Sequence, residues 1–191
     1  MHFGETKDPD LAAVVDAWPE LPEVIQAGIL AMIRTLGALL GATEKAEHLC
    51  DDLQARLEEV RAAGKRRDRH PRIYFEEWDD PMISGIGWVS ELIEAAGGID
   101  VFADRASCKS AKDRIVTAEE VVRNEPDIII GSWCGKKFRP EKLAKRPGFD
   151  RIPAVKSGAL HEIKSPLILQ PGPAALTDGL AALQAIVANA I

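Results

Sequence analysis

The sequence has little that would indicate a disulfide-stabilised, redox or zinc protein. Its 191 residues include three cysteines, Cys50, Cys108 and Cys134. An odd count leaves at least one thiol free, and no Cys-x-x-Cys pair is present for zinc or redox chemistry. A disulfide between Cys108 and Cys134 is an alternative for a chain that reaches an oxidising compartment. The cysteines therefore exclude a disulfide framework.

Export and membrane signals are also missing from the sequence. The N-terminal stretch MHFGETKDPD lacks the basic start and the apolar run of a secretory signal, so we expect the chain as written to be cytoplasmic. The most apolar stretch, residues 25–42, contains Gln26 and Arg34. It is too short and too polar for a membrane span.

Basic residues are too few and too scattered for a nucleic-acid surface. The formal net charge is −6, and the densest basic run, residues 65–69, lies between a helical pattern and a strand. A solvated linker is the ordinary interpretation of such a run, and a polyanion site is the alternative. We therefore expect no nucleic-acid partner.

Motifs of the common enzyme classes are absent as well. Gly131 to Lys137 has the wrong spacing for a phosphate loop, and no G-x-S-x-G surrounds Ser132. Cys134 with His161 as its base lacks any signature, and the carboxylates of residues 76–80 are more typical of a solvated loop than of a cation site. The histidines lack metal-ligand spacing. The sequence therefore predicts neither an enzyme nor a metal site, and no cofactor of its own.

The first third of the chain has helical patterns. Asp8–Pro9 is typical of a helix start, and a second pattern covers residues 23–40. Thr43 can cap a third helix that ends near Gly64. Its apolar stripe is spaced as one helix face and consists of Ala46, Leu49, Cys50, Leu53, Leu57 and Val60.

From Pro71 onward, strand and helix patterns alternate. Strand patterns cover residues 72–77, 127–132 and 159–163, and helical patterns fall between and after them. Thr117 and Glu120 fit a capping box at one helix start. Such alternation predicts an α/β fold: one three-layer lobe with a small parallel sheet flanked by helices, preceded by a long helix.

Two tryptophans follow neighbouring strand patterns. Trp78 follows the first strand and Trp133 the strand at residues 127–132. Ligands of open parallel sheets bind beyond the carboxyl ends of the strands, where aromatic rings suit a large, flat, partly apolar ligand. The alternative is that both rings only cover the end of the sheet. If Trp133 lines a ligand face, we expect it to be at least partly exposed and on the same edge as Trp78.

Several motifs in this order resemble a known family. They read RIYFEEWDDPMISG, WVSELIEAAGG, RIVTAEEVVRNEPDIIIGSW and IPAVKSGALHEIKSPLILQPGPAALTDGL. Together they resemble the C-terminal lobe of cobalamin-binding proteins, the solute-binding components of vitamin B12 ABC transporters. The resemblance covers residues 32–191 and extends to siderophore- and haem-binding relatives. It implies a corrinoid ligand, a permease partner and a periplasmic location.

The resemblance also implies roles for individual residues. Glu119 corresponds to the glutamate with which such proteins dock on arginines of the permease. The implied ligand-binding residues are Glu77, Trp78, Ser84, Trp133, Leu169 and Gln170. No metal ligand and no catalytic residue is implied.

The chain departs from the family pattern at its start. Relatives have a whole N-terminal lobe before the joining helix, whereas here about thirty residues precede that region. We therefore predict an unrelated helical tail at residues 1–31, a joining helix with a basic linker at 32–70, and the C-terminal lobe at 71–191. Binding by a lone lobe would be weak or absent. The alternative is a vestigial interaction protein without a ligand, which forms a homodimer through its exposed lobe face.

Overall fold

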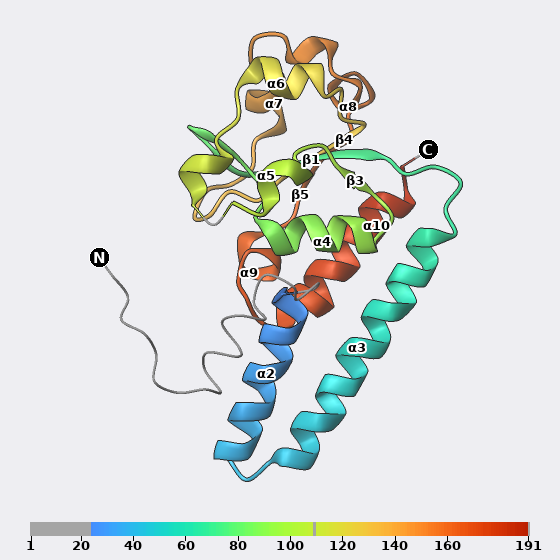
Figure 1. The fold of residues 1–191 in the computed structure, drawn as a ribbon. Helices are drawn as coiled ribbons and strands as arrows, with labels where there is room; N and C mark the ends of the chain where they lie inside the picture. The colour runs from blue at the N-terminus through green and yellow to red at the C-terminus, as the bar shows by residue number, and fades with distance from the viewer. Residues whose placement is uncertain (1–23, 109, 191) are drawn as a thin grey trace.

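The computed structural model describes residues 24–108 and 110–190 of the chain. It consists of a helical hairpin that projects from an α/β lobe (Figure 1). The hairpin is made of α2 (Val24–Leu39) and α3 (Thr43–Lys65). The helix that we predicted to start at Asp8–Pro9 lies outside the described residues.

The two hairpin helices pack closely against each other. A Cβ on Gly37 would lie 2.3 Å from the Cβ of Ala46, so glycine is required for this approach. Most of the predicted α3 stripe is buried, but Leu49 is 42% exposed, which corrects our expectation for that residue. The boundary that we placed after residue 31 falls within α2, and the division of the chain there stays a prediction.

The sheet of the lobe is mixed, and its parallel part was predicted. Parallel strands are β1 (Arg72–Asp79), β3 (Ile99–Asp100), β4 (Ile128–Gly131) and β5 (Leu160–Glu162). The strand order is β2-β1-β4-β5, and β3 pairs with the start of β1. We did not predict β2 (Met82–Ser84), which runs antiparallel to the end of β1.

Helices cover both faces of the sheet. The remaining elements are α4 (Gly87–Ala95), α5 (Ala103–Ala106), η2 (Ala111–Arg114), α6 (Ala118–Arg123), α7 (Pro140–Ala144), η3 (Phe149–Arg151), α8 (Pro153–Ser157), α9 (Ser165–Ile168), η4 (Ala175–Gly179) and α10 (Leu180–Ala188). In Figure 1, α3, α4 and α10 lie below the sheet and α6, α7 and α8 above it. This is the three-layer lobe expected from the sequence.

Alternation along β1 divides the core between the two faces. Ile73 and Phe75 join the cluster under α3, α4 and α10, whereas Tyr74 joins the cluster under α6, α7 and α8. Side chains of a strand point to opposite faces in turn, so Glu76 follows Tyr74 into the second layer. A carboxylate thus enters a core layer, and its partners define one side of the candidate site.

Candidate ligand-binding edge of the sheet

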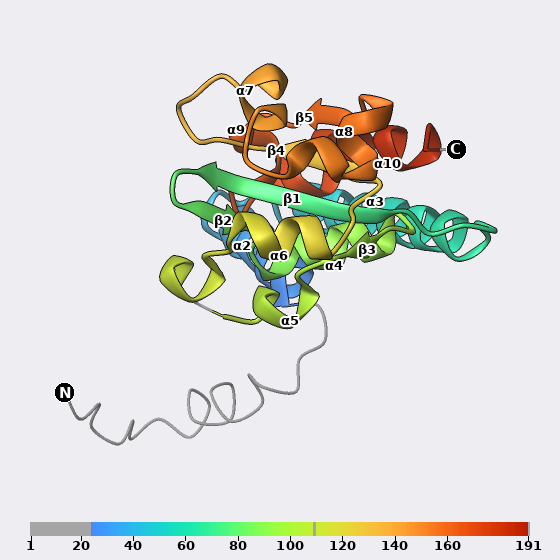
Figure 2. The same cartoon turned by 90° about the horizontal axis from the view of Figure 1, so that it is seen from above.

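The strands β1, β4 and β5 end at the same edge of the sheet, which we call the carboxyl edge. In Figure 2 this edge lies on the left, where β1 reaches the hairpin with β2. Two adjoining pockets of about 420 and 320 Å³ open here, and they share three lining residues, Trp133, Lys136 and Lys137. The larger one is also lined by Gly135, Glu162, Lys164, Ser165 and Pro166, and the smaller one by Asp79, Arg139 and Lys142.

Trp133 is buried, with 4% of its surface exposed, so the expectation of partial exposure is wrong. Its ring meets Phe138 edge to face, with centroids 5.1 Å apart. Phe138 in turn packs over Gly131, where an added Cβ would lie 2.1 Å from the Phe138 ring. Trp133 therefore forms the inner wall that both pockets share and does not project from the edge as a platform.

Glu76 holds Trp133 in this place from inside the lobe. The indole Nε1–H of Trp133 donates to Glu76 Oε1 at 2.9 Å, and the Tyr74 hydroxyl donates to Glu76 Oε2 at 2.9 Å. Arg146 pairs with both carboxylate oxygens, and Glu76 is fully buried. Burial and the neighbouring carboxylate raise the pKa of Tyr74 well above its ordinary value. Sequence reasoning missed this network, although the alternation of Tyr74 and Glu76 along β1 was a signal for it.

Trp78 lies on the same edge, as predicted, but its ring is already in contact with a cation. Lys136 Nζ lies 4.3 Å from the centre of the Trp78 ring, within the range of a cation–π contact. The Trp78 Nε1–H donates to the carbonyl of Asp80 at 2.9 Å. Lys136 therefore links Trp78 to the pockets, because the same lysine lines both of them.

Asp79 ends β1 beneath two lysines. Lys136 Nζ donates to Asp79 Oδ1 at 2.7 Å, and Lys142 Nζ donates to Oδ2 at 3.3 Å. The Asp79 side chain is only 2% exposed, whereas the side chains of Lys136 and Lys142 are 46% and 64% exposed. Burial acts against the charged carboxylate, but the two lysines outweigh burial and hold the pKa of Asp79 below its ordinary value.

Two of the predicted ligand-binding residues, Glu77 and Ser84, surround a buried arginine instead of a pocket. Glu77 forms an ion pair with Arg114 at 2.6 Å. The buried Ser84 hydroxyl donates to the Arg114 carbonyl at 3.1 Å. Neither residue lines the two pockets of the carboxyl edge. Both therefore have structural partners, and their role in binding stays a prediction.

Leu169 and Gln170 follow α9 and are placed differently from each other. Leu169 packs against the core under α4 and α10, and Gln170 is exposed. Ser165 and Pro166, at the start of the same segment, line the larger pocket of the carboxyl edge. The segment thus contributes to the edge through its first residues, and a role for Leu169 and Gln170 stays a prediction.

Glu119 lies exposed in the first turn of α6. The predicted capping box is confirmed: Thr117 Oγ1 accepts from the Glu120 amide at 3.2 Å, and Glu120 Oε2 accepts from the Thr117 amide at 2.8 Å. Glu120 also pairs with Arg105. The cap therefore uses Glu120 and leaves Glu119 directed to solvent.

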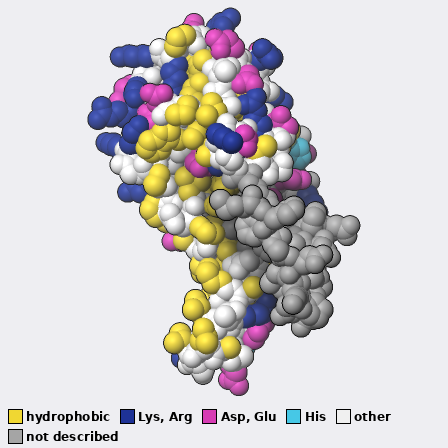
Figure 3. All heavy atoms as spheres, turned by 60° about the vertical axis from the view of Figure 1, so that its left-hand side comes forward, with side chains coloured by type: hydrophobic (Ala, Val, Ile, Leu, Met, Phe, Trp, Pro, Cys, Tyr) yellow, Lys and Arg dark blue, Asp and Glu magenta, His cyan; other side chains and the backbone are white. Residues whose placement is uncertain are grey.

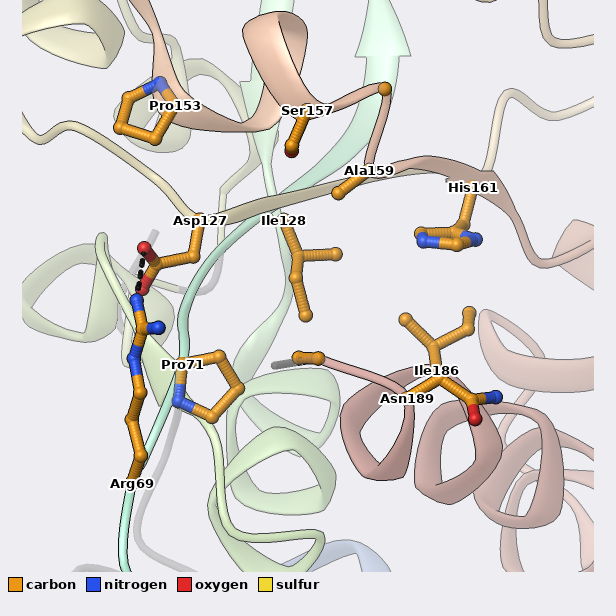
Figure 4. A pocket seen from close by; sticks show the side chains of 12 residues that line it. Arg69, Pro71, Asp127, Ile128, Pro153, Ser157, Ala159, His161, Ile186 and Asn189 are labelled. Carbon is orange, nitrogen blue, oxygen red and sulfur yellow. Dashed lines mark hydrogen bonds and ion pairs between the residues drawn. The ribbon is translucent and has the colours of Figure 1, made fainter.

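A larger cavity, of about 510 Å³, lies at the opposite, amino edge of the sheet (Figure 4). Apolar side chains such as Ile128 and Ile186 line it, together with His161 and the ion pair between Arg69 and Asp127. We give the carboxyl edge more weight despite the smaller volumes, because ligands of parallel sheets bind beyond the carboxyl ends of the strands.

Disulfides and metal clusters do not occur among the described residues. Cys50, Cys108 and Cys134 are all free thiols, so the Cys108–Cys134 bond considered above is not formed. Across residues 24–108 and 110–190, no three His, Cys, Asp or Glu side chains are grouped to hold a metal ion. None of the described helices has the length and hydropathy to cross a membrane.

An α/β lobe with pockets at its carboxyl edge is typical of ligand-binding proteins. The sequence matches the periplasmic binding protein family over residues 11–167, and the chain belongs to this family. Its members are periplasmic or extracellular solute-binding proteins of transporters and not enzymes. A search of curated proteins found no match.

Solved structures with the same fold include several transport proteins. A possible iron-binding, periplasmic solute-binding protein from Staphylococcus epidermidis has a TM-score of 0.71 and 22% identity, with 85% of this chain and 62% of that chain covered. An ABC transporter substrate-binding protein from Listeria monocytogenes has a TM-score of 0.68 and 19% identity, with 84% and 64% covered. The chain thus spans less than two thirds of these two proteins.

A periplasmic haem-binding protein from a Roseiflexus species is similar as well. Its TM-score is 0.68 and its identity 24%, with 95% of this chain and 73% of that chain covered. At these identities the structural likeness shows the fold alone. The described residues form a single lobe of that fold.

Proposed function

We propose that the chain is a ligand-binding lobe of an ABC transporter's solute-binding protein, and that it takes an anionic metal chelate such as haem or a ferric siderophore. The observation that carries this proposal is the smaller pocket of the carboxyl edge. Four basic side chains, Lys136, Lys137, Arg139 and Lys142, surround the single carboxylate of Asp79 there. In a chain of net charge −6, such a local excess of positive charge favours an anionic ligand.

The names of similar proteins agree with a ligand of this kind. They include the iron-binding and haem-binding proteins above and an Fe3+-hydroxamate transport protein from Saccharomonospora viridis. Haem carries two carboxylates, and the carboxyl edge offers several lysines that can pair with them. A single lobe offers one side of a cleft, so we expect weak binding.

A corrinoid is the second candidate ligand. It is supported by the ordered motifs from residue 72 onward that resemble cobalamin-binding proteins. Cyanocobalamin carries no net charge, so the basic pocket gives it less support than it gives an anionic chelate. The two candidates differ in the effect of salt, because screening weakens the attraction between exposed charges.

Titration with haemin, ferric citrate and cyanocobalamin at two salt concentrations tests the proposal. We expect haemin or ferric citrate to bind, with an affinity that falls as salt rises. A Lys137→Gln/Arg139→Gln variant should weaken this binding, whereas Lys156→Gln, on α8 and away from both edge pockets, should not. Salt-independent binding of cyanocobalamin alone would favour the corrinoid, and no binding of any probe at millimolar concentration would contradict the proposal.

We also propose that Glu119 docks on a permease. Its support is the exposed carboxylate in the first turn of α6 and the family resemblance at this position. Glu119→Lys should weaken association with permease-containing membranes without altering haemin binding. The matched control is Glu141→Lys, in the first turn of α7. Equal effects of the two changes would contradict a specific docking role.

A further inference from the structure

The two lysines of the smaller pocket are held by one buried carboxylate. Lys136 and Lys142 bind the opposite oxygens of Asp79, so their ammonium groups are kept near each other. Two exposed ammonium groups repel each other, and the carboxylate between them offsets that repulsion. Each ammonium uses one of its three donors on Asp79 and can direct the others to a ligand.

Asp79 itself is fixed from inside the lobe. Its carbonyl accepts a hydrogen bond of 3.2 Å from Arg146, and Arg146 pairs with the fully buried Glu76. The Trp78 ring fixes Lys136 from a second direction, at 4.3 Å. The carboxylate that binds both lysines therefore belongs to a buried, hydrogen-bonded residue. In an ordinary surface ion pair, by contrast, both partners are mobile.

Asp79 and its two lysines differ in how much of each side chain is exposed to solvent. Asp79 is almost completely covered, and the two ammonium groups face the pocket with roughly half of each lysine exposed. We infer that Asp79 is the positioning residue of a two-lysine clamp that binds one oxyanion group, a carboxylate or a phosphate, in the smaller pocket. This inference rests on the proposed function and adds to it the charged group of the ligand that the pocket recognises.

The clamp and the net charge of the pocket predict opposite effects of Asp79→Asn on anion binding. Asp79→Asn removes a negative charge from the pocket, so charge alone would tighten anion binding. If Asp79 positions the lysines, the same change loses the clamp and weakens binding by about tenfold or more. Glu141→Gln is the matched control, because it removes one negative charge beside Lys142 at a residue that lines neither edge pocket.

Titrations of the full chain with sodium propionate and with sodium phosphate, at constant ionic strength set by NaCl, test this inference. Calorimetry is the readout, because a fluorescence signal from Trp78 would change on replacement of Lys136 itself. We expect saturable binding of at least one anion, a loss of binding in Asp79→Asn and in Lys136→Gln/Lys142→Gln, and no loss in Glu141→Gln. The relative affinities of the two salts separate a carboxylate clamp from a phosphate clamp.

Unchanged or tighter binding in Asp79→Asn would overturn the inference, and so would saturable binding by the double lysine variant or no binding of either anion by the wild type. The double variant keeps the test valid if Asp79→Asn fails to fold, since both lysines are substantially exposed. Haemin binding without propionate or phosphate binding would leave the proposed function and reject the clamp. Propionate or phosphate binding without any chelate binding would support the clamp and reject the proposed function.

Discussion

The Trp133 indole donates a hydrogen bond of 2.9 Å to the Glu76 carboxylate and so links the segment after β4 to β1 inside the lobe. Trp133→Ala should therefore destabilise the protein by about 3–5 kcal/mol, because it deletes a buried aromatic ring. Trp133→Phe keeps an aromatic ring and loses the donor, and we expect a cost of about 1–3 kcal/mol. Urea denaturation of both variants measures these costs, and a loss under about 1 kcal/mol for Trp133→Ala would show that the ring is not core.

Asp79 and Asp100 should give opposite pH dependences of stability. The lysines lower the pKa of Asp79, so its stabilising contribution is complete above the ordinary value of about 3.9 and is lost as pH falls through the lowered pKa. Burial raises the pKa of Asp100, so its contribution is complete below the ordinary value and is lost as pH rises through the raised pKa.

Urea midpoints between pH 3 and pH 6 measure both effects. Relative to the wild type, Asp79→Asn should lose more stability at pH 6 than at pH 3. Asp100→Asn should show the reverse trend, so its stability relative to the wild type should rise with pH. Parallel pH profiles for the two variants would contradict the assigned pKa directions.

Two glycines of α2 should respond in opposite ways to the same substitution. Gly28→Ala should stabilise the helix by up to about 1 kcal/mol, because alanine has the higher helix propensity and nothing lies within 4 Å of the added Cβ. Gly37→Ala should destabilise the protein, because its Cβ would lie 2.3 Å from that of Ala46. Thermal unfolding of the two variants is the measurement, and stabilisation by both would mean that the hairpin can separate without cost.

The exposed leucines of the hairpin offer one test of the homodimer, which the sequence left as an alternative with its contact on the lobe face. Leu39 and Leu40, at the end of α2, are 77% and 79% exposed. Figure 3 shows hydrophobic side chains along one face of the hairpin. Changing both to serine should alter stability by less than about 0.5 kcal/mol in the monomer. If a dimer forms through this face, sedimentation at several concentrations should show a weaker association for the variant. A wild type that stays monomeric at high concentration would reject the dimer.

The three thiols should react in the order of their exposure. Cys134 is exposed, Cys108 is half-buried and Cys50 is buried, and burial also raises the pKa of the Cys50 thiol. A timed reaction with a thiol reagent, followed by peptide mass analysis, should therefore label Cys134 first and Cys50 last. Early labelling of Cys50 would mean that the hairpin opens readily.

The fold was predicted from local patterns, and the errors arise where distant residues meet. Ile128, Ile129 and Ile130 form an apolar run that predicts a buried strand wherever it lies in the sheet. The strand β2 is only three residues long, and its pairing with β1 defines it, so no local period indicates it.

The site was predicted less well for the same reason. Trp133 was assigned to the right edge, but its burial depends on Glu76, which lies 57 residues away along the chain. Lys136 and Lys137 follow Trp133 directly in the sequence, whereas the approach of Lys142 to Asp79 spans 63 residues. Periodicity shows which residues point inward, and it does not show which inward residues meet.

The α2–α3 hairpin can be considered as a lever. At about 1.5 Å per residue, α3 is roughly 35 Å long, and its buried face continues to Gly64, where an added Cβ would lie 2.5 Å from the Ala95 carbonyl of α4. Because α3 is fixed to the lobe at one end and to α2 at the other, a small rotation of the lobe is magnified at the hairpin tip. A spin label near Ala42 would therefore report the orientation of the lobe with high sensitivity.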